Sequence, residues 1–286
     1  MIEFPSGLHI HTVWGDGKNT PEEMILAAVA AGFESVGISE HAYAPYDTVC
    51  IPKDKMDGYR GEVFSLKEKY RGTIEVYAGI EVDFHCLYDK DQWDFVIGSV
   101  HYVRGRKQWD RAIGPESCAC GVSGDYYPID YTEESILKAI ADIGSARYLV
   151  QDYCESVAVL AESYRPDILG HIDVITKLNA KYPFFDEQSG WYLSLWEGLI
   201  GRIAATGVIV ELNSGAVSRG WRDAPYPAPE LIEMLRKKNV PVTISSDAHR
   251  ADDIDCAYPA ILDALRKAGY SSVKMLKGGR FCDYGI

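Results

Sequence analysis

Short apolar runs rich in β-branched residues alternate along the chain with longer segments in which apolar residues recur at helical spacing. The short runs predict seven strands, at residues 7–10, 35–38, 74–80, 94–100, 167–170, 207–212 and 240–245. The longer segments predict helices at about residues 20–32, 55–70, 132–165, 189–206, 228–238 and 253–268. The first helix has an N-cap in Thr20, a proline at its first position and Gly32 at its end. The stretch 132–165 must break, and Gly144 is the expected place.

Repeated strand–helix units predict an α/β fold with a parallel sheet, and seven strands over this length favour a TIM-like barrel. A doubly wound open sheet is the alternative, but no G-x-G-x-x-G follows the first strand. We expect residues 1–286 to form one domain, because no linker, internal repeat or low-complexity tract divides them. Residues 103–131 are rich in Gly, Cys and Tyr without periodicity, which predicts a long loop that covers a functional site or is disordered.

The composition narrows the classes of partner. The 286 residues are 47% hydrophobic and carry a net charge of −13, so the field of the whole chain disfavours nucleic acid. No basic start, signal-like segment or run of about 18 apolar residues is present, and we expect a cytoplasmic protein without membrane contact. The seven cysteines lack the spacing of a metal finger, and Cys118 and Cys120 in the long loop are weak metal candidates.

The histidines are few, but their placement is unusual. Six of the seven lie at or just after the end of a predicted strand, and two acids occupy the same kind of position: His9, His11, His41, His101, His171, His249, Glu81 and Asp247. A lone residue of this kind is more often a hydrogen-bonded structural group than a ligand. In a parallel barrel, however, the carboxyl ends of all strands meet at one face, which would collect all eight side chains. The joint arrangement therefore predicts a metal site.

The residue types indicate which metals would bind. Imidazoles with carboxylates and without thiolates suit Zn, Fe or Mn. Eight ligands exceed the needs of one ion, and a carboxylate can bridge two metals through its two oxygens. Glu81 is the natural bridge in such a cluster.

At this point the sequence resembles a known family, the polymerase and histidinol phosphatase (PHP) superfamily, and most closely its monofunctional histidinol-phosphatase branch. The resemblance rests on motifs in family order from Leu8 to His249: Leu8-His9-Ile10-His11-Thr12, Gly15-Asp16-Gly17, Ser39-Glu40-His41, Gly79-Ile80-Glu81, Gly98-Ser99-Val100-His101, Gly170-His171-Ile172-Asp173 and Ser246-Asp247-Ala248-His249. It implies a distorted (β/α)7 TIM-like barrel. Many relatives carry Asp two residues before the first histidine, where this chain has Gly7, and that Asp would orient a ligand.

The resemblance also implies three divalent metal ions and their ligands. The first ion would be held by His9, His11, Glu81 and Asp247. The second would be held by Glu81, His101 and His171, and the third by Asp16, His41 and His249. Spacing alone had not suggested Asp16, because a Gly-Asp-Gly turn is typical of a loop. His85 matches no motif and is expected to be structural.

The implied activity is hydrolysis of a small phosphate monoester, with histidinol phosphate of histidine biosynthesis as the expected substrate. In our hypothesis a hydroxide that bridges two metals attacks phosphorus. We expect Asp247, His249 and Arg219 to be catalytic, with Arg219 also gripping phosphate beside substrate-binding Tyr102 and Tyr226. No residue stands out as the acid that protonates the leaving group. The alternatives are a phosphatase or phosphoesterase for another small ester or a short oligonucleotide, and a non-catalytic metal-binding partner domain, although such domains often lose ligands and all nine positions are filled here.

Overall fold

The computed structural model describes residues 3–86, 88–105 and 125–286. Seven strands form one sheet in the order β1-β2-β3-β4-β7-β8-β9, and every pair is parallel. Their bounds are β1 (Ser6–Gly7), β2 (Ser35–Ile38), β3 (Glu75–Asp83), β4 (Phe95–Ser99), β7 (Ile168–Leu169), β8 (Ile209–Asn213) and β9 (Val242–Ser245). Beyond β1, Ile10 bridges Ala248 and the His11 N–H donates to the Ala248 carbonyl at 2.9 Å, which brings the last strand back to the first. The predicted distorted seven-stranded barrel is confirmed.

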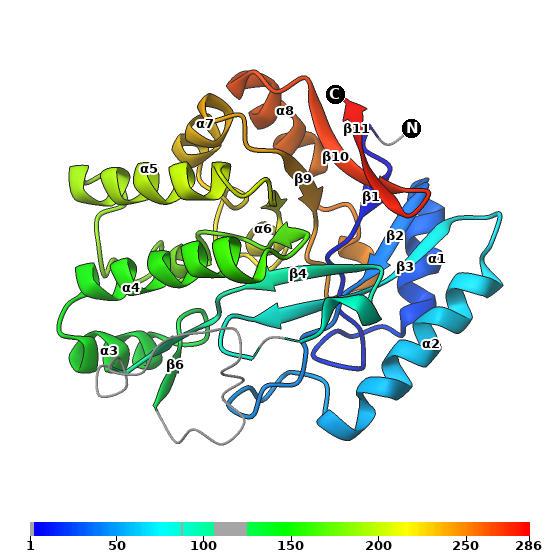
Figure 1. Ribbon diagram of the computed structural model, residues 1–286, viewed down its shortest axis with the longest axis horizontal. Coiled ribbons are helices and arrows are strands. Elements are labelled where there is room, and N and C mark those ends of the chain that lie inside the picture. The colour runs from blue at the N-terminus through cyan, green and yellow to red at the C-terminus, as the bar shows by residue number, and fades with distance from the viewer. Residues whose placement is uncertain (1–2, 87, 106–124) are drawn as a thin grey trace.

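Helices surround this sheet, as Figure 1 shows with α3, α4 and α5 layered on one side and α1 and α2 on the other. They are α1 (Pro21–Ala31), α2 (Met56–Lys69), α3 (Glu133–Ile143), α4 (Ala146–Val159), α5 (Gly190–Ala204), α6 (Gly215–Ser218), α7 (Pro229–Lys237) and α8 (Tyr258–Ala268). No helix in the described part of the chain combines the length and apolar character that a membrane span requires.

Local signals in the sequence account for most helix ends. Thr20 and Glu23 form a reciprocal capping box at the start of α1, and Gly32 ends the helix with a left-handed φ of 86°. The expected break lies at Gly144, whose φ of 107° separates α3 from α4, and Ser145 caps α4. The helix predicted at 253–268 begins later, at Tyr258, because Ala257 adopts φ 56° after a short 3₁₀ turn at Ala251–Asp253.

The amino-terminal end of the barrel is filled by a separate apolar cluster and by an element that was not predicted. Strands β10 (Ser272–Lys277) and β11 (Arg280–Gly285) form an antiparallel hairpin with Gly278 and Gly279 in its turn, both at positive φ. Leu276 of the hairpin packs with Leu8, Tyr77, Phe95, Ile97, Ile168 and Ile209. The hairpin packs beside β9, and near it the rings of Phe4 and Tyr284 are 5.7 Å apart, so the first and last described segments of the chain lie close together (Figure 1).

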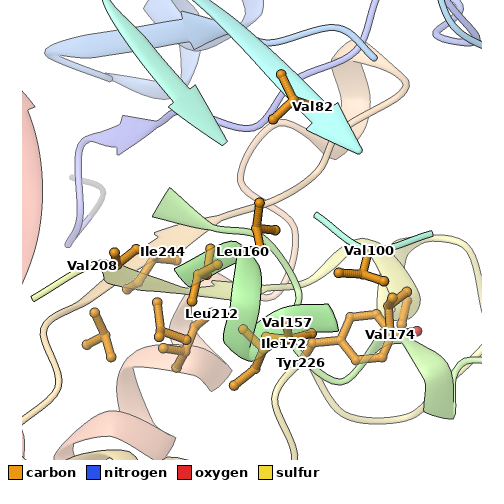
Figure 2. Packing of buried hydrophobic residues seen from close by; sticks show 14 of the residues in the cluster. Val82, Val100, Val157, Leu160, Ile172, Val174, Val208, Leu212, Tyr226 and Ile244 are labelled. Carbon is orange, nitrogen blue, oxygen red and sulfur yellow. The ribbon is translucent and has the colours of Figure 1, made fainter. Parts of the chain in front are cut away.

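Close packing inside the barrel depends on two glycines. The Phe95 ring lies across Gly37 of β2 and Gly79 of β3, and a Cβ at Gly79 would stand only 2.2 Å from the ring. Outside the barrel, Leu212 of β8 and Ile244 of β9 belong to the same large apolar cluster as Val157 of α4, part of which Figure 2 shows. The result is a rigid frame whose strand ends can hold polar groups in fixed positions.

The region predicted as a long loop contains short strands at both of its ends. β5 (Tyr102–Arg104) pairs with β6 (Tyr126–Pro128) in a two-stranded antiparallel ribbon. The Ile129 N–H donates to the His101 carbonyl at 2.9 Å, which fixes the end of this ribbon beside the barrel mouth. Cys118 and Cys120 fall outside the described residues.

Candidate metal centre

The strand ends, with the turn that carries Asp16, bring all nine predicted ligands to one face of the barrel. His9 and His11 follow β1, His41 follows β2, and Glu81 lies near the end of β3. Four overlapping groups have ligand atoms within 4.8 Å of one another: His11, Asp16, His41 and His249; His9, His11 and Asp247; His9, Glu81 and His171; His41, Glu81 and His101. Every predicted ligand belongs to at least one group, so the structure places them as one continuous cluster.

Glu81 lies at the centre of this cluster and is 1% exposed. Its Oε2 atom is 2.8 Å from His41 Nδ1 and 3.3 Å from His9 Nε2. Its Oε1 atom is 3.2 Å from His171 Nε2 and 3.5 Å from His101 Nε2. Oε2 is also 3.7 Å from His11 Nε2. The two carboxylate oxygens therefore face different sets of imidazoles, an arrangement that suits a carboxylate shared by two cations.

Asp247 and Asp16 extend the cluster on the other side. Asp247 Oδ1 lies 3.2 Å from His11 Nε2 and 3.6 Å from His249 Nδ1, while Asp16 Oδ1 lies 3.2 Å from His249 Nε2. Asp247 also adopts a left-handed φ of 52°, which is uncommon for a residue with a side chain. Such local strain is typical of functional positions, because the surrounding structure must enforce it.

The electrostatics of the cluster also fit cations. Burial opposes the charge of His9, but the carboxylates of Glu211 and Glu81 outweigh this and raise its pKa well above the ordinary value. Glu81 is likewise buried, yet His9 and His41 hold its pKa well below the usual range. Burying carboxylates this deeply is costly unless positive charge compensates them.

Several polar atoms in the cluster are buried without a hydrogen-bond partner: His9 Nε2, His11 Nδ1, His11 Nε2, Asp16 Oδ1 and Glu81 Oε2. Unsatisfied buried polar atoms carry a large free-energy cost, and all but one of these point at other members of the cluster. Divalent cations between them would satisfy these lone pairs. The donor set of nitrogens and carboxylate oxygens therefore fits Zn, Fe or Mn.

Three acids that the sequence did not single out hold ligand histidines by their rings or by their backbone. Glu211 Oε1 lies 2.8 Å from His9 Nδ1, and Glu211 Oε2 accepts the backbone N–H of His171 at 2.9 Å. Asp83 Oδ2 accepts the backbone N–H of His101 at 2.9 Å and lies 3.7 Å from His101 Nδ1. Asp83 could have been found, because it lies two residues after Glu81 and shares its face of β3.

Glu40, the third acid, stands within the quoted Ser39-Glu40-His41 motif and lies 3.6 Å from His11 Nδ1. It also accepts a hydrogen bond from the Thr12 hydroxyl at 2.5 Å. Groups in this position fix the ring orientation of a metal-bound histidine and raise its basicity.

The departure at Gly7 has a structural counterpart. A Cβ at Gly7 would lie 2.9 Å from the Phe33 ring and 2.9 Å from the Tyr258 hydroxyl, so these two side chains take up the space. The Nδ1 atom of His9, which needs an orienting partner, is held by Glu211 instead. The His9 ring therefore has a fixed orientation although position 7 carries no acid.

Arg219 is turned toward the predicted ligands. Its Nη2 donates to Asp247 Oδ2 and its Nη1 donates to the Asp247 carbonyl, each at 2.9 Å, and Nη1 is also 2.9 Å from His249 Nδ1. Tyr102 lies on the wall of the cavity above the cluster, whereas Tyr226 is 1% exposed and packs behind the His171 ring. His85 lies aside from the cluster, with Nε2 3.2 Å from the Tyr102 carbonyl.

A cavity of about 290 Å³ opens above the cluster, which is the size of site that takes a small molecule. Its walls combine predicted ligands with other polar and aromatic groups: Asp16, His41, Asp47, Val49, His101, Tyr102, Asp130, Tyr131, His171, Val174, Lys177, Arg219, Trp221, Asp247 and His249. Arg219 and Lys177 are the cations of this lining within the described residues.

Comparison with known proteins identifies the family. The model of the PHP domain matches residues 7–215, which is most of the chain and contains seven of the nine predicted ligands. The chain belongs to the PHP-domain family. This PHP protein is 26% identical over 280 residues to the probable histidinol-phosphatase of Deinococcus radiodurans, covering 93% of this chain and 94% of that protein. It is 25% identical to the histidinol-phosphatase of Bacillus subtilis, covering 89% and 97%.

The fold agrees with a solved structure of the same kind. A histidinol phosphate phosphatase from Lactococcus lactis, crystallised with zinc, L-histidinol and phosphate, superposes with a TM-score of 0.68 at 18% identity, covering 97% of this chain and 98% of that chain. The PHP family, the relatives and the buried His, Glu and Asp clusters together identify a metal-dependent phosphoesterase.

Proposed function

We propose that this PHP protein hydrolyses histidinol phosphate, using divalent metal ions held by the nine clustered side chains. The observation that carries the proposal is the position of Glu81, whose two oxygens face different sets of imidazoles in the cluster beneath the cavity. A site for one structural ion needs about four ligands and no open side. A nine-ligand cluster below an open cavity suits catalysis by several ions.

Three ions would be distributed as the family resemblance implies. The first would take His9, His11, Glu81 and Asp247; the second Glu81, His101 and His171; and the third Asp16, His41 and His249. The groups overlap, since His41 is near Glu81 as well as near Asp16, which supports one compact cluster. When bound, such ions supply Lewis acidity and an activated water. The zinc in the Lactococcus lactis relative supports Zn as one candidate beside Fe and Mn.

The protein's own groups would orient the substrate and its phosphate. Arg219 lies on the cavity wall, and its bonds to Asp247 and His249 fix the guanidinium beside the cluster. A fixed guanidinium can offer its remaining N–H groups to a phosphoryl oxygen, and these bonds strengthen as charge spreads in the transition state. Asp247 and His249 would act in catalysis by holding the ions in place.

The upper cavity suits a cationic, aromatic leaving group. Asp47 and Asp130 place carboxylates on its wall, and Tyr102, Tyr131 and Trp221 add aromatic faces. Histidinol phosphate carries an amine and an imidazole, which such groups would bind by charge attraction and stacking. The relatives named above and the L-histidinol bound by the Lactococcus lactis protein support the same substrate.

A phosphate-release assay tests the proposal. Protein stripped of metal is supplied separately with Mn, Fe(II) or Zn and assayed with histidinol phosphate, other small phosphomonoesters and short oligonucleotides. We expect the highest kcat/KM with histidinol phosphate. The Asp247→Asn variant is the control, and we expect it to be inactive. Preference for another monoester would overturn the substrate assignment and leave the phosphatase activity standing. Cleavage of oligonucleotides would support a nuclease. Metal binding without any turnover would support a partner domain.

A further inference from the structure

The ion pair between Lys177 and Asp130 lies on the cavity wall outside the set of metal ligands. Lys177 Nζ is 2.9 Å from Asp130 Oδ2, and the two side chains are only 14% and 12% exposed. The pair connects two parts of the fold, because Lys177 ends the 3₁₀ turn Val174–Thr176 after His171 and Asp130 follows the β6 strand. The Lys177 ammonium also lies over the Trp221 ring, 5.9 Å from its centroid.

Backbone bonds hold both partners beside the ligand-bearing strand ends. The Lys177 N–H donates to the Val174 carbonyl at 2.8 Å, and the Val174 N–H donates to the His171 carbonyl at 2.9 Å. On the other side, Ile129 is bonded to the His101 carbonyl, which fixes Asp130 next to it. The pair therefore stands over the His101 and His171 side of the cluster. The substrate would lie between this pair and the metal ligands.

Hydrolysis of an alkyl phosphate requires a proton donor, because an alkoxide is a poor leaving group. Among the described residues of the cavity wall, few side chains can act as that donor. Burial raises the pKa of the Tyr131 phenol to about 12. Arg219 is held by hydrogen bonds to Asp247, and a guanidinium keeps its proton far more tightly than an ammonium does.

The Asp130 carboxylate does not fill this role. Asp130 is buried, but Lys177 and His101 lower its pKa, so it is ionised and accepts rather than donates. Its Oδ1 atom has no hydrogen-bond partner. An alkylammonium, by contrast, is a stronger acid than an aliphatic alcohol and carries three N–H donors on a flexible stem.

We propose that Lys177, positioned by Asp130, donates the proton to the leaving oxygen of the phosphate ester. A water molecule attacks phosphorus and loses its proton to solvent, the bond between phosphorus and the ester oxygen breaks, and that oxygen takes a proton from Lys177 Nζ. The products are the alcohol and inorganic phosphate, and the neutral amine regains a proton from water at the cavity mouth. Lys177 is then a catalytic residue and Asp130 a positioning residue. This inference rests on the proposed function.

The role can be tested with two kinds of ester. An alkyl ester such as histidinol phosphate needs the proton, whereas p-nitrophenyl phosphate releases a stable phenolate and does not. Lys177→Met should lower kcat/KM for the alkyl ester by ~100- to 10,000-fold and leave p-nitrophenyl phosphate within about threefold of the wild type. Lys177→Arg keeps the positive charge, but a guanidinium is a much weaker acid than an ammonium, so this variant should show the same selective loss. A surface control, Lys138→Met, removes an exposed lysine paired with Glu134 and should change neither rate.

Two further measurements separate proton donation from other roles. The double variant Asp130→Asn with Lys177→Met leaves no uncompensated carboxylate and serves if the single variant does not fold. Metal content by elemental analysis and the affinity for inorganic phosphate by calorimetry should stay near wild-type values. The proposal is overturned if both esters lose activity equally, if neither does, if Lys177→Arg restores the alkyl ester, or if the wild type cleaves only p-nitrophenyl phosphate. A wild type inactive on every monoester instead removes the proposed function.

Discussion

The Glu81 carboxylate faces imidazoles from four different strand ends, and its two oxygens face different sets of them. Glu81→Gln keeps the shape of the side chain but replaces one oxygen by an amide that offers no lone pair to a cation. We therefore expect the purified variant to lose at least two of its ions, and elemental analysis measures the loss. Glu134→Gln, on the surface of α3, is the matched control. Full metal occupancy in Glu81→Gln would show that Glu81 is peripheral.

Arg219 differs from its expected role in one respect, because its guanidinium is bonded to two predicted ligands. The sequence suggested only that Arg219 grips phosphate. With Asp247 Oδ2 and His249 Nδ1 both held by Arg219, we expect Arg219→Ala to lower kcat/KM by ~10- to 1,000-fold and also to weaken metal affinity. Steady-state kinetics at saturating metal and a metal titration separate the two effects. Arg202→Ala, which removes an exposed arginine of α5, should leave both unchanged. Near-normal kcat/KM in Arg219→Ala would remove Arg219 from the site.

Asp173 is a buried acid with an incomplete set of partners. Its Oδ2 accepts the Ala228 N–H at 2.9 Å, its Oδ1 has no partner, and burial raises its pKa to about 7. Because the pKa is higher in the folded than in the unfolded chain, the protonated acid stabilises the fold. That contribution is complete below about pH 4 and is lost as the pH rises to about 7, by roughly 4 kcal/mol in total.

Asp173→Asn removes this titration and keeps an acceptor for Ala228. The wild type and the variant, both metal-free, are unfolded with urea at several pH values. The free energy of unfolding of the variant should exceed that of the wild type by an amount that grows from pH 5 to pH 7 and then levels off. Asp252→Asn, which alters an exposed acid, should show no such trend. A difference independent of pH would mean that Asp173 is ionised in the folded protein throughout this range.

At the scale of elements, the seven barrel strands could be predicted because each is a local apolar run bounded by turn residues. The hairpin of β10 and β11 was missed, although Gly278 and Gly279 in its turn are a recognisable hairpin signal. The β5–β6 ribbon could not be predicted in the same way, since its strands are three residues long and far apart in the sequence. Helix α8 was predicted too long, because no local sequence pattern predicts the positive φ of Ala257.

In the candidate site, too, residues in local motifs could be predicted from the sequence, and partners from distant segments could not. Eight of the nine metal-ligand candidates could be named from the sequence because each stands in a short motif at a strand end, whereas Asp16, in a Gly-Asp-Gly turn, came only from the family resemblance. Glu211 could not, since its bond to His9 joins residues 202 positions apart. The pair of Lys177 and Asp130 is likewise formed by tertiary structure, across 47 positions. Partners of this kind become visible only when the strand order of the barrel is known.

Across the whole molecule, polar chemistry and apolar packing occupy opposite ends of the barrel. The predicted ligands gather at the carboxyl ends of the strands, and the β10–β11 hairpin covers the amino-terminal end, where Leu276 is 1% exposed. In barrels of this type, the carboxyl-end face carries the reaction and the other face contributes stability. The two ends should therefore respond independently to substitution.

Leu276→Ala tests this separation. Removing the buried side chain leaves a cavity between the hairpin and the barrel, and we expect a loss of about 2–5 kcal/mol in the free energy of unfolding. Metal content and kcat below the unfolding transition should stay at wild-type values, because the rigid strands keep the mouth in place. Leu137→Ala, at a half-exposed position of α3, should change stability by no more than about 0.5 kcal/mol. Chemical denaturation, elemental analysis and kinetics on the same preparations decide the matter: a folded Leu276→Ala protein that has lost its metals would show that the hairpin also sets the geometry of the metal centre.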